Sequence, residues 1–372
     1  MKRIIFLLVI FVLILTVFPP RTAGAKGSIS ARSAILMDQD SGRILYEKNA
    51  NEVSRIASIT KIMTAILAIE SGKLEKKVTI SEKAVRTEGS SIYLKPGDKV
   101  KLEDLVYGLM LRSGNDAANA IAENVGGSIE GFVFLMNQKA KEIGMNNTHF
   151  ANPNGLDSRK MDHFSTAYDM ALLTRYAMQN KTYQKIAGTK TYKGWRNKNR
   201  LLTEKYKYCT GGKTGFTKLA KRTLVTTASK NGENLIVVTL NDPDDWNDHI
   251  SMFEYGFKNY DSTIILKQGK ISAIKNKYLK NNVYIKHEVD YPLTKQEREE
   301  VEIEYKVMKP NKSWKDPEKI PEIVGKAVIY LDKTPIRTVP IYYHFTNKKA
   351  KEGWIKEFLH VFLIQIGVKT NG

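Results

Sequence analysis

The hydrophobic positions in the first part of the chain form short apolar runs and longer helical patterns. Two runs, 34–37 and 44–46, flank a segment rich in turn-forming residues, and this arrangement predicts a β-hairpin. The stretch 56–70 is apolar on most sides and contains neither glycine nor proline, so it predicts a buried helix. Gly72 lies just beyond this stretch and suits the end of the helix.

Helical and strand patterns continue as far as about residue 260. Apolar residues at helical spacing predict three further helices, at 102–111, 117–125 and 132–143. Thr166 and Asp169 have the spacing of an N-terminal capping box, which predicts that another helix begins there. After a loop at 211–212, strands are predicted at 223–228 and 235–240. The second of these is apolar throughout, which is typical of a strand buried on both faces.

The pattern changes after about Tyr260. Alternating apolar and polar residues at 283–285, 301–305 and 327–330 predict half-exposed strands, and prolines separate them. These features together predict a small all-β domain that ends near Phe345.

The last residues return to a helical pattern. Apolar residues recur at helical spacing from Trp354 to Ile366, and several lysines lie at or before the start of this stretch. The pattern predicts an amphipathic helix at 347–372. We expect its apolar face to bind a membrane surface, although packing onto the β domain would bury the same face.

The chain begins with a targeting pattern. Two basic residues precede an apolar run from Ile4 to Phe18, and 23–25 is a cleavage site of small residues. The run is short for a membrane-spanning helix, which needs about 20 apolar residues. We therefore favour a cleaved signal peptide over an uncleaved anchor, and we expect the protein to be exported.

These patterns divide the chain into four parts. We predict a signal peptide at 1–25, a mixed α/β domain at 26–260, a β-rich domain at 261–346 and an amphipathic helix at 347–372. The total of 372 residues is enough for two domains with cores of their own.

Composition and charge narrow the class of protein. With 42% hydrophobic and 26% charged residues, the chain is globular. Its formal net charge of +20 is spread along the chain rather than gathered in one basic block, which argues against nucleic-acid binding. Lipid headgroups or cell-wall polymers are the anionic partners to consider, and solubility alone would also explain the charge. The single cysteine, Cys209, forms no internal disulfide and is more often a packing residue than a nucleophile in such a place.

Three short motifs occur in order along the chain. They are 58–61 (Ser-Ile-Thr-Lys), 113–115 (Ser-Gly-Asn) and 213–215 (Lys-Thr-Gly). Each is weak alone, because 272–275 also fits the first pattern and 229–231 fits the second. Their context is more specific: the first opens a buried helix, the second lies between two helices, and the third begins a strand.

The first motif has the residues of an activated nucleophile. Ser58 and Lys61 are three residues apart and therefore lie on one face of a helix. A lysine can take the serine proton only if its pKa is lowered, which the apolar helix and a second cation, Lys213, would do. A helix N-terminus at Ser58 would also stabilise developing negative charge.

The other two motifs complete a site for acyl transfer. Ser113 would relay a proton between the lysine and the leaving group, and Asn115 would hold the lysine and the substrate amide. A strand that begins at Lys213 can pair with an extended peptide, and Gly215 leaves room beside it. The backbone amides of the nucleophile and of Phe216 would form the oxyanion hole.

At these residues the chain resembles the D-alanyl-D-alanine carboxypeptidases of the penicillin-binding protein 5 type. The stretches that carry the likeness are 57–65, 113–118, 152–156, 163–169 and 213–217. The likeness covers the whole chain after the signal peptide, and 56–58 and 213–222 look most like the sporulation-associated branch of endospore-forming bacteria. It implies the α/β (α+β) fold of serine β-lactamases and penicillin-binding proteins, in which helices flank an antiparallel sheet, with 26–260 as the catalytic domain.

The resemblance also implies a reaction. Ser58 would attack the last peptide bond of a peptidoglycan stem peptide ending in D-Ala-D-Ala, the terminal D-Ala would leave, and water would hydrolyse the acyl-enzyme. β-Lactams mimic this dipeptide and would acylate Ser58. No metal or other cofactor is implied. The expected location is the outer face of the cytoplasmic membrane or the cell-wall space, which in a spore former includes the space between the forespore membranes.

Two departures from the family pattern affect the site. Many relatives carry an arginine just after the strand that matches 235–240, where it holds the terminal carboxylate of the substrate, whereas 241–245 contains none. Carboxylate binding then falls to three residues: Thr214, Thr217 and Arg222, whose guanidinium can be bidentate. Relatives often have histidine where this chain has Asn154, which leaves the role of that position open.

Other functions fit the motifs less well. A serine β-lactamase of the commonest class needs a Glu-x-x-x-Asn loop to activate water, and none occurs between Asn115 and Lys213. A D,D-endopeptidase would use the same residues and stays an alternative. A silent penicillin-binding sensor or a wall-binding scaffold is disfavoured, because the catalytic set is complete.

Overall fold

The computed structural model describes residues 29–157 and 160–344. Contacts within the chain separate two units, Met1–Asp261 and Ser262–Gly372, whereas the sequence predicted a boundary between residues 260 and 261. The predicted signal peptide at 1–25 and the predicted amphipathic helix at 347–372 lie outside the described residues. Among the described residues, no helix has the length and apolar character needed to cross a membrane.

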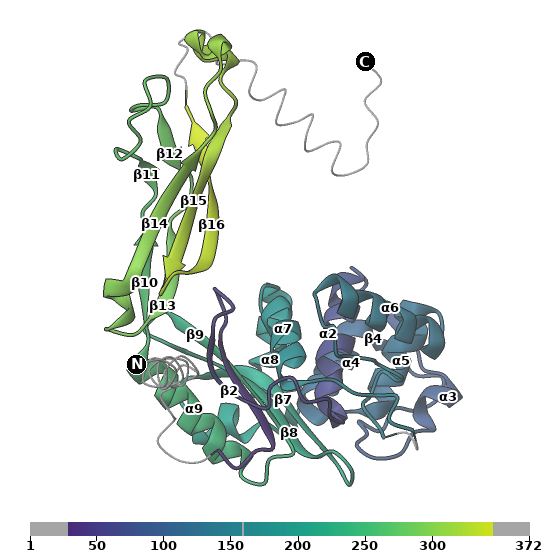
Figure 1. Ribbon diagram of the computed structural model, residues 1–372. Coiled ribbons are helices and arrows are strands. Elements are labelled where there is room, and N and C mark those ends of the chain that lie inside the picture. The colour runs from purple at the N-terminus through teal and green to yellow at the C-terminus, as the bar shows by residue number, and fades with distance from the viewer. Residues whose placement is uncertain (1–28, 158–159, 345–372) are drawn as a thin grey trace, which may run out of the picture. The chain divides into compact units, whose positions relative to one another are not determined.

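The first unit is built around a five-stranded antiparallel sheet (Figure 1). In the order β2-β1-β9-β8-β7, its strands are Ile44–Lys48, Ser33–Asp38, Glu233–Leu240, Lys221–Lys230 and Cys209–Thr217. Every residue of β1 is buried, as are the last six of β9. β7 lies at one edge of the sheet, with β8 on its inner side.

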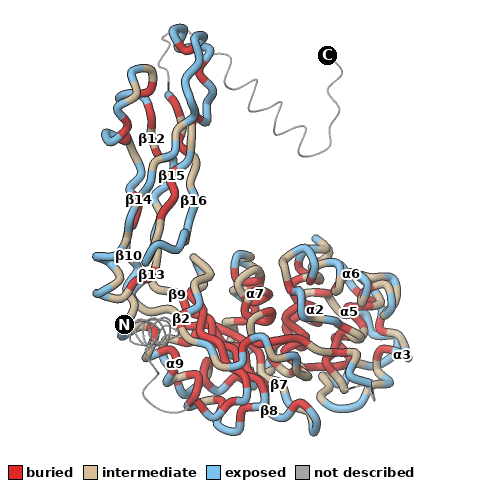
Figure 2. Tube along the Cα trace, viewed as in Figure 1, coloured by how far each residue is buried: buried red, intermediate tan, exposed pale blue. Residues whose placement is uncertain are grey.

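Side chains alternate across this sheet and bury both of its faces. Ile35 and Met37 of β1 belong to one apolar core, and Ala34 and Leu36 belong to another on the opposite face. Figure 2 shows buried segments concentrated in the sheet and in the helices around it. Burial on both faces explains why the strands read as continuous apolar runs.

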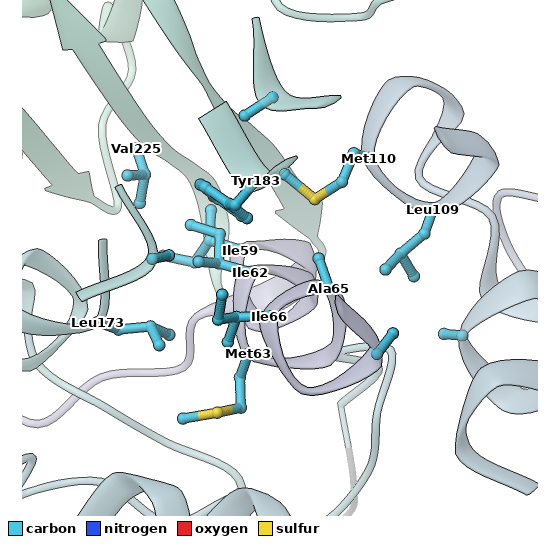
Figure 3. Close-up of a cluster of buried hydrophobic side chains, with 14 of the residues drawn as sticks. Ile59, Ile62, Met63, Ala65, Ile66, Leu109, Met110, Leu173, Tyr183 and Val225 are labelled. Atoms are coloured by element: carbon cyan, nitrogen blue, oxygen red, sulfur yellow. The ribbon is translucent and has the colours of Figure 1, made fainter. Parts of the chain in front are cut away.

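Most helices contribute to the first core. They are α2 (Lys61–Glu70), α3 (Glu82–Val85), α4 (Leu102–Tyr107), α5 (Asn115–Gly126), α6 (Ile129–Glu142), α7 (Ala167–Ala177) and α8 (Lys181–Ala187). α2 is central to this core, and Figure 3 shows Ile62 and Ile66 of α2 among Leu109, Leu173 and Tyr183 of its neighbours. The other face of the sheet is covered by α9 (Asp245–Asn259), which was not predicted from the sequence.

Two predicted helices are each divided into two parts. The stretch 56–70 forms a 3-10 turn, Ala57–Thr60, followed by α2. The stretch 102–111 forms α4 followed by a π-helical turn, Gly108–Arg112. The change of helix type places Ser58 on a 3-10 turn, and it places Ser113 directly after a π-helical turn.

The predicted loop at 211–212 is wrong, and so is the predicted strand start at Lys213. β7 begins at Cys209 and continues through both glycines, with a register shift against β8 between Cys209 and Gly211. Gly212 has a φ of 134°, and a Cβ there would lie 2.1 Å from Val225 O. The glycines therefore permit an irregular strand that approaches β8 closely, rather than a turn.

The second unit is all-β in its described part, apart from short 3-10 turns. In the order β11-β12-β16-β15-β14, its main sheet contains Gly269–Lys270, Val283–Ile285, Thr334–Tyr343, Ile323–Leu331 and Val301–Val307. β10 (Asp261–Leu266) pairs separately with β13 (Val289–Leu293). The sequence analysis missed β16 because of Pro335 and Pro340. β12 pairs only with Tyr342 and Tyr343 of β16, so both prolines lie where β16 has no neighbour on that side.

Candidate active site

Ser58 lies on the 3-10 turn that precedes α2. Two hydrogen bonds hold this turn: Thr60 Oγ1 donates to Ala57 O at 2.8 Å, and Thr223 Oγ1 of β8 donates to Ile56 O at 2.9 Å. Ala57 has a φ of 49°, a left-handed conformation that costs free energy in a residue with a Cβ. The contacts with β8 therefore hold the nucleophile in a conformation that α2 alone would not provide.

The amine of Lys61 lies directly behind Ser58. The Lys61 side chain is 0% exposed. Its Nζ is 3.0 Å from Ser58 Oγ and 2.7 Å from Asn115 Oδ1, and it also contacts Asn154 O. The structure thus brings the first two motifs together, and it adds a backbone carbonyl that the sequence analysis did not assign.

Three lysines near the cavity each have a pKa that is lowered by burial and by neighbouring positive charge. Burial, then Lys213, then Lys198 lower the pKa of Lys61 well below its usual value. Burial and Lys198 lower the pKa of Lys213 to about 7. Lys198, whose Nζ donates to Ser90 Oγ at 3.0 Å, has its own pKa lowered by burial and by Arg112. These shifts therefore favour neutral amines, the state in which a lysine accepts a proton.

The second motif is held by the loop that contains Glu88 and Ser90. Asn115 Nδ2 donates to Glu88 O at 2.6 Å, and Asn115 N donates to Ser90 O at 2.7 Å. These bonds fix the amide so that its oxygen faces Lys61. Ser113 follows the π-helical turn with a φ of 64°, a left-handed backbone conformation, and it is 5% exposed.

Gly215 brings the edge strand close to the nucleophile. A Cβ at this position would lie 2.4 Å from Thr223 Oγ1 and 3.0 Å from Ser58 N. Only glycine permits this approach, because real Cβ atoms do not come so close to other atoms. The backbone of β7 therefore passes beside the Ser58 amide, and Phe216 follows at once along the strand.

These groups surround a cavity of about 300 Å³. Its lining residues are Ser58, Ser90, Ser113, Lys198, Thr214, Gly215, Phe216, Arg222, Asp245 and Trp246. The cavity joins residues of all three motifs, while Lys61, Asn115 and Lys213 are buried beside it. A larger hollow of about 860 Å³ in the same unit is lined by polar side chains and by no motif residue, so cavity size alone does not locate the chemistry.

Two family models match the sequence. One is described as D-alanyl-D-alanine carboxypeptidase and matches residues 20–244. The other is described as the C-terminal domain of penicillin-binding protein 5 and matches residues 260–349. The chain belongs to the D-alanyl-D-alanine carboxypeptidase family.

Individual members of this carboxypeptidase family agree with the assignment. D-alanyl-D-alanine carboxypeptidase DacF of Bacillus subtilis is 37% identical over 296 residues, which are 73% of this chain and 75% of DacF. DacC of Escherichia coli is 37% identical over 278 residues, 68% of this chain and 67% of DacC. Crystal structures of penicillin-binding protein 5 from Haemophilus influenzae match with a TM-score of 0.71 at 29% identity, covering 88% of this chain and 98% of that one. The predicted fold and the serine carboxypeptidase class are thereby confirmed.

The sequence analysis missed several residues of this carboxypeptidase site. Lys198 has no distinguishing pattern around it, and only its position in the fold reveals its charge beside Lys213. Asp116 follows the second motif directly, and its carboxylate accepts hydrogen bonds from Ser91 Oγ at 2.6 Å and from the amides of Ile92 and Leu94, which holds the loop above the cavity. The position of Asp116 directly after the second motif was the signal in the sequence that could have identified it.

His163 contacts the turn that carries Ser58. Its Nε2 lies 2.8 Å from Thr60 Oγ1, and its Nδ1 accepts from Ala151 N at 3.0 Å. Burial lowers the pKa of His163 to about 4, so the ring is neutral at neutral pH. It therefore braces the turn that carries the nucleophile without adding a charge.

Arg222 is one of the lining residues of the cavity, and its guanidinium already has a partner. Nε and Nη2 lie 3.0 Å and 2.6 Å from the two oxygens of Asp245, and Cζ lies 5.3 Å from the centroid of a Trp246 ring. From the sequence, 241–245 was distinguished only by its lack of arginine. The binding of Arg222 by the last residue of this segment was not predicted.

Cys209 is outside the cavity lining. The residue is 8% exposed, and burial raises the pKa of its thiol to about 11. A thiol in this state is protonated at neutral pH and packs as a small apolar group.

Proposed function

We propose that Ser58 is the nucleophile and Lys61 the base of a serine-type D-Ala-D-Ala carboxypeptidase. The observation that supports this most strongly is the set of contacts at Lys61 Nζ. A neutral amine has two N–H donors and one lone pair. Asn115 Oδ1 and Asn154 O can only accept, so they take both N–H groups, and the lone pair is left for the Ser58 hydroxyl.

Acylation begins with attack by Ser58 and ends with departure of the terminal D-Ala. Lys61 takes the proton of Ser58 while Oγ bonds to the carbonyl carbon of the penultimate D-Ala, and the carbonyl electrons move onto oxygen. The amides of Ser58 and Phe216 donate to this oxyanion. As the C–N bond breaks, Ser113 relays the proton from Lys61 to the departing nitrogen, and D-Ala leaves. Water attacks the ester with the help of the same base and restores Ser58.

Substrate binding uses the free edge of β7. The stem peptide adds to this edge as an extended strand, which Gly215 permits, and Asn115 binds its amide. Lys213 supplies positive charge beside the reacting groups, although part of the population is neutral near its pKa of about 7. Thr214, Thr217 and Arg222 hold the terminal carboxylate of the substrate.

The remaining parts of the chain fit an enzyme of the cell envelope. Members of the family act in the periplasm or in association with the cell wall. Residues 1–25 serve as the signal peptide, 26–260 as the catalytic domain, 261–346 as a β domain and 347–372 as a helix that binds the membrane surface. In a spore former, the likeness of 56–58 and 213–222 to the sporulation-associated branch would place the enzyme between the forespore membranes.

One experiment tests this proposal. Wild type and Ser58→Ala are incubated with fluorescent penicillin and, separately, with a stem pentapeptide, and released D-Ala is measured. Wild type should be labelled and should release D-Ala, whereas Ser58→Ala should do neither. Absence of label on wild type would exclude the acyl-enzyme, label without D-Ala release would indicate a sensor, and rapid loss of label would indicate a β-lactamase.

A further inference from the structure

The active-site cavity extends over both sides of the edge strand. Gly215 faces the turn that carries Ser58, because a Cβ there would lie 3.0 Å from Ser58 N. Neighbouring residues of a strand point to opposite faces, so Thr214 and Phe216 point to the other face of the sheet. Both residues line the same cavity as Ser58. Part of the cavity is therefore built on the face of the sheet that α9 covers.

Arg222 belongs to that second part of the cavity. It is opposite Phe216 in the pairing of β8 with β7, so the two Cα atoms are about 5 Å apart. Its guanidinium meets Asp245, the first residue of α9, and the ring of Trp246, the next one. The Asp245 side chain is 4% exposed and the Arg222 side chain is 42% exposed, so the carboxylate is buried and the guanidinium reaches the cavity.

The geometry leaves part of the guanidinium free for a second carboxylate. An arginine has five N–H donors in one plane. Asp245 takes one from Nε and one from Nη2, along one side of the group. Two donors on Nη1 and one on Nη2 remain, and an adjacent pair of them matches the two oxygens of a carboxylate approaching end-on. The Trp246 ring lies against the guanidinium and limits its movement further.

We propose that Asp245 and Trp246 are positioning residues that hold Arg222 for the terminal carboxylate of the substrate. The resulting subsite selects peptides that end in a free carboxylate over amidated or cross-linked peptides. This inference rests on the proposed carboxypeptidase function, and it assigns the preference for chain ends to Asp245, Trp246 and Arg222. If Arg222 is removed, the buried carboxylate of Asp245 is left without its partner beside the cavity, and it would repel the carboxylate of the substrate.

The test compares two substrates that differ only at the terminal group. One is a short peptide ending in D-Ala-D-Ala with a free carboxylate, and the other carries a terminal amide. Wild type should prefer the acid. Asp245→Asn should raise KM for the acid about tenfold, the fold-change expected from weakening one charge-assisted contact, with kcat and the kinetics on the amide unchanged. Asp245→Glu should recover part of the preference, and Arg222→Met should abolish it.

A matched control and a double variant separate positioning from stability. Glu204→Gln removes the carboxylate that pairs with Arg196 and Arg200 outside the cavity, and it should leave both substrates unaffected. If Asp245→Asn unfolds at a lower temperature, the double variant Arg222→Met with Asp245→Leu removes both charges and keeps the volume. The double variant should lose the preference for the acid but bind it better than Arg222→Met alone.

The outcomes are distinct. A preference for the acid that survives in all four variants at the site overturns the inference and leaves the proposed function intact. An equal loss on acid and amide also overturns it, because that result indicates a purely structural ion pair. A wild-type protein that releases neither D-Ala from the acid nor D-alaninamide from the amide overturns the proposed function and this inference together.

Discussion

The two five-stranded sheets differ in whether the charged side chains around them are buried. Around the first sheet, charged side chains are buried, among them Lys61, Lys213, Asp116 and Asp245. In the described part of the second unit, every lysine, arginine, aspartate, glutamate and histidine is at least partly exposed. Burying a charged group costs free energy unless it is paired or becomes neutral. The first unit accepts this cost at several places, and at Lys61 and Lys213 the lowered pKa favours the neutral amine that the chemistry needs.

The same difference is visible in the ion pairs. Lys306 and Glu304 on β14 are 2.9 Å apart, and both are about half exposed, so their pairing adds little to stability. Arg222 and Asp245 join an exposed group to a buried one beside the cavity. An ion pair of the second kind is costly to break from one side, because it leaves a buried charge without a partner.

The largest expected effect is the loss of acylation rate when Lys61 is replaced. It tests whether a buried lysine and an exposed lysine differ in their importance for acylation. Lys61→Met keeps the volume but removes the base, so acylation by penicillin should slow by about 1,000-fold, within the range for general-base catalysis. The same substitution at the exposed Lys326 of β15 should leave the rate unchanged. Acylation at the wild-type rate by Lys61→Met would refute the assignment of the base.

The next largest effect is expected from replacing a strand glycine by alanine, and one such glycine from each unit is compared. Gly215→Ala places a Cβ 3.0 Å from Ser58 N, which displaces the strand or the nucleophile and should slow acylation by about 100-fold. Gly325→Ala places a Cβ 2.3 Å from Lys306 O and should destabilise the second unit by about 1–3 kcal/mol. Acylation rates and thermal unfolding, measured for both variants, should separate the two effects. Equal losses of activity would contradict the comparison.

A smaller effect concerns pH and the stability of the first unit. The unfolded chain keeps the proton of Lys213 up to about pH 10.4, whereas the folded protein releases it at a pKa of about 7. Between these values the unfolded state binds more protons, so the free energy of unfolding should rise with pH, by at most about 1.4 kcal/mol per unit. Below pH 7 the amine of Lys213 is charged in both states, so the full free-energy cost of burying its charge lowers the stability of the folded protein.

Denaturant unfolding between pH 7 and pH 9 measures this dependence. Lys213→Met lacks the titrating group, so its free energy of unfolding should rise less steeply with pH than that of wild type. Lys61 acts in the same direction in both proteins, because its pKa is also lowered by burial. Parallel curves for wild type and Lys213→Met would show that the pKa of Lys213 is ordinary.

The smallest effect is expected on stability when a helix-capping residue is removed, and one cap from each unit is compared. Thr166 accepts a hydrogen bond from Asp169 N at 3.0 Å at the start of α7, and Asn311 accepts from Ser313 N at 2.8 Å at the start of a short exposed turn. Thr166→Ala should cost about 1 kcal/mol of stability, and Asn311→Ala should cost less, because it caps a single turn. Unfolding by denaturant measures both, and acylation should not change. A larger loss for Asn311→Ala would reverse the ranking.

Much of the fold followed from local pattern. The hairpin of β1 and β2, the cap at Thr166 and the apolar strand β9 were all visible as periodicities or as residue types at fixed spacings. Two failures concern residue types that usually interrupt strands. Gly212 was predicted in a loop and Pro340 as a break between strands, whereas Gly212 lies where β7 approaches β8 closely and Pro340 lies where β16 is not paired with β12.

The site divides in the same way. Ser58 and Lys61 are three residues apart, and a single helical turn is enough to bring them together, so the sequence by itself determined this pair and the order of the three motifs. Only the tertiary structure decided that Asn154 O and Lys198 belong beside them and that Asp245 binds Arg222. The physical reason is that a lysine's pKa and an arginine's direction depend on burial and on charges brought from distant parts of the chain, and no local pattern contains that information.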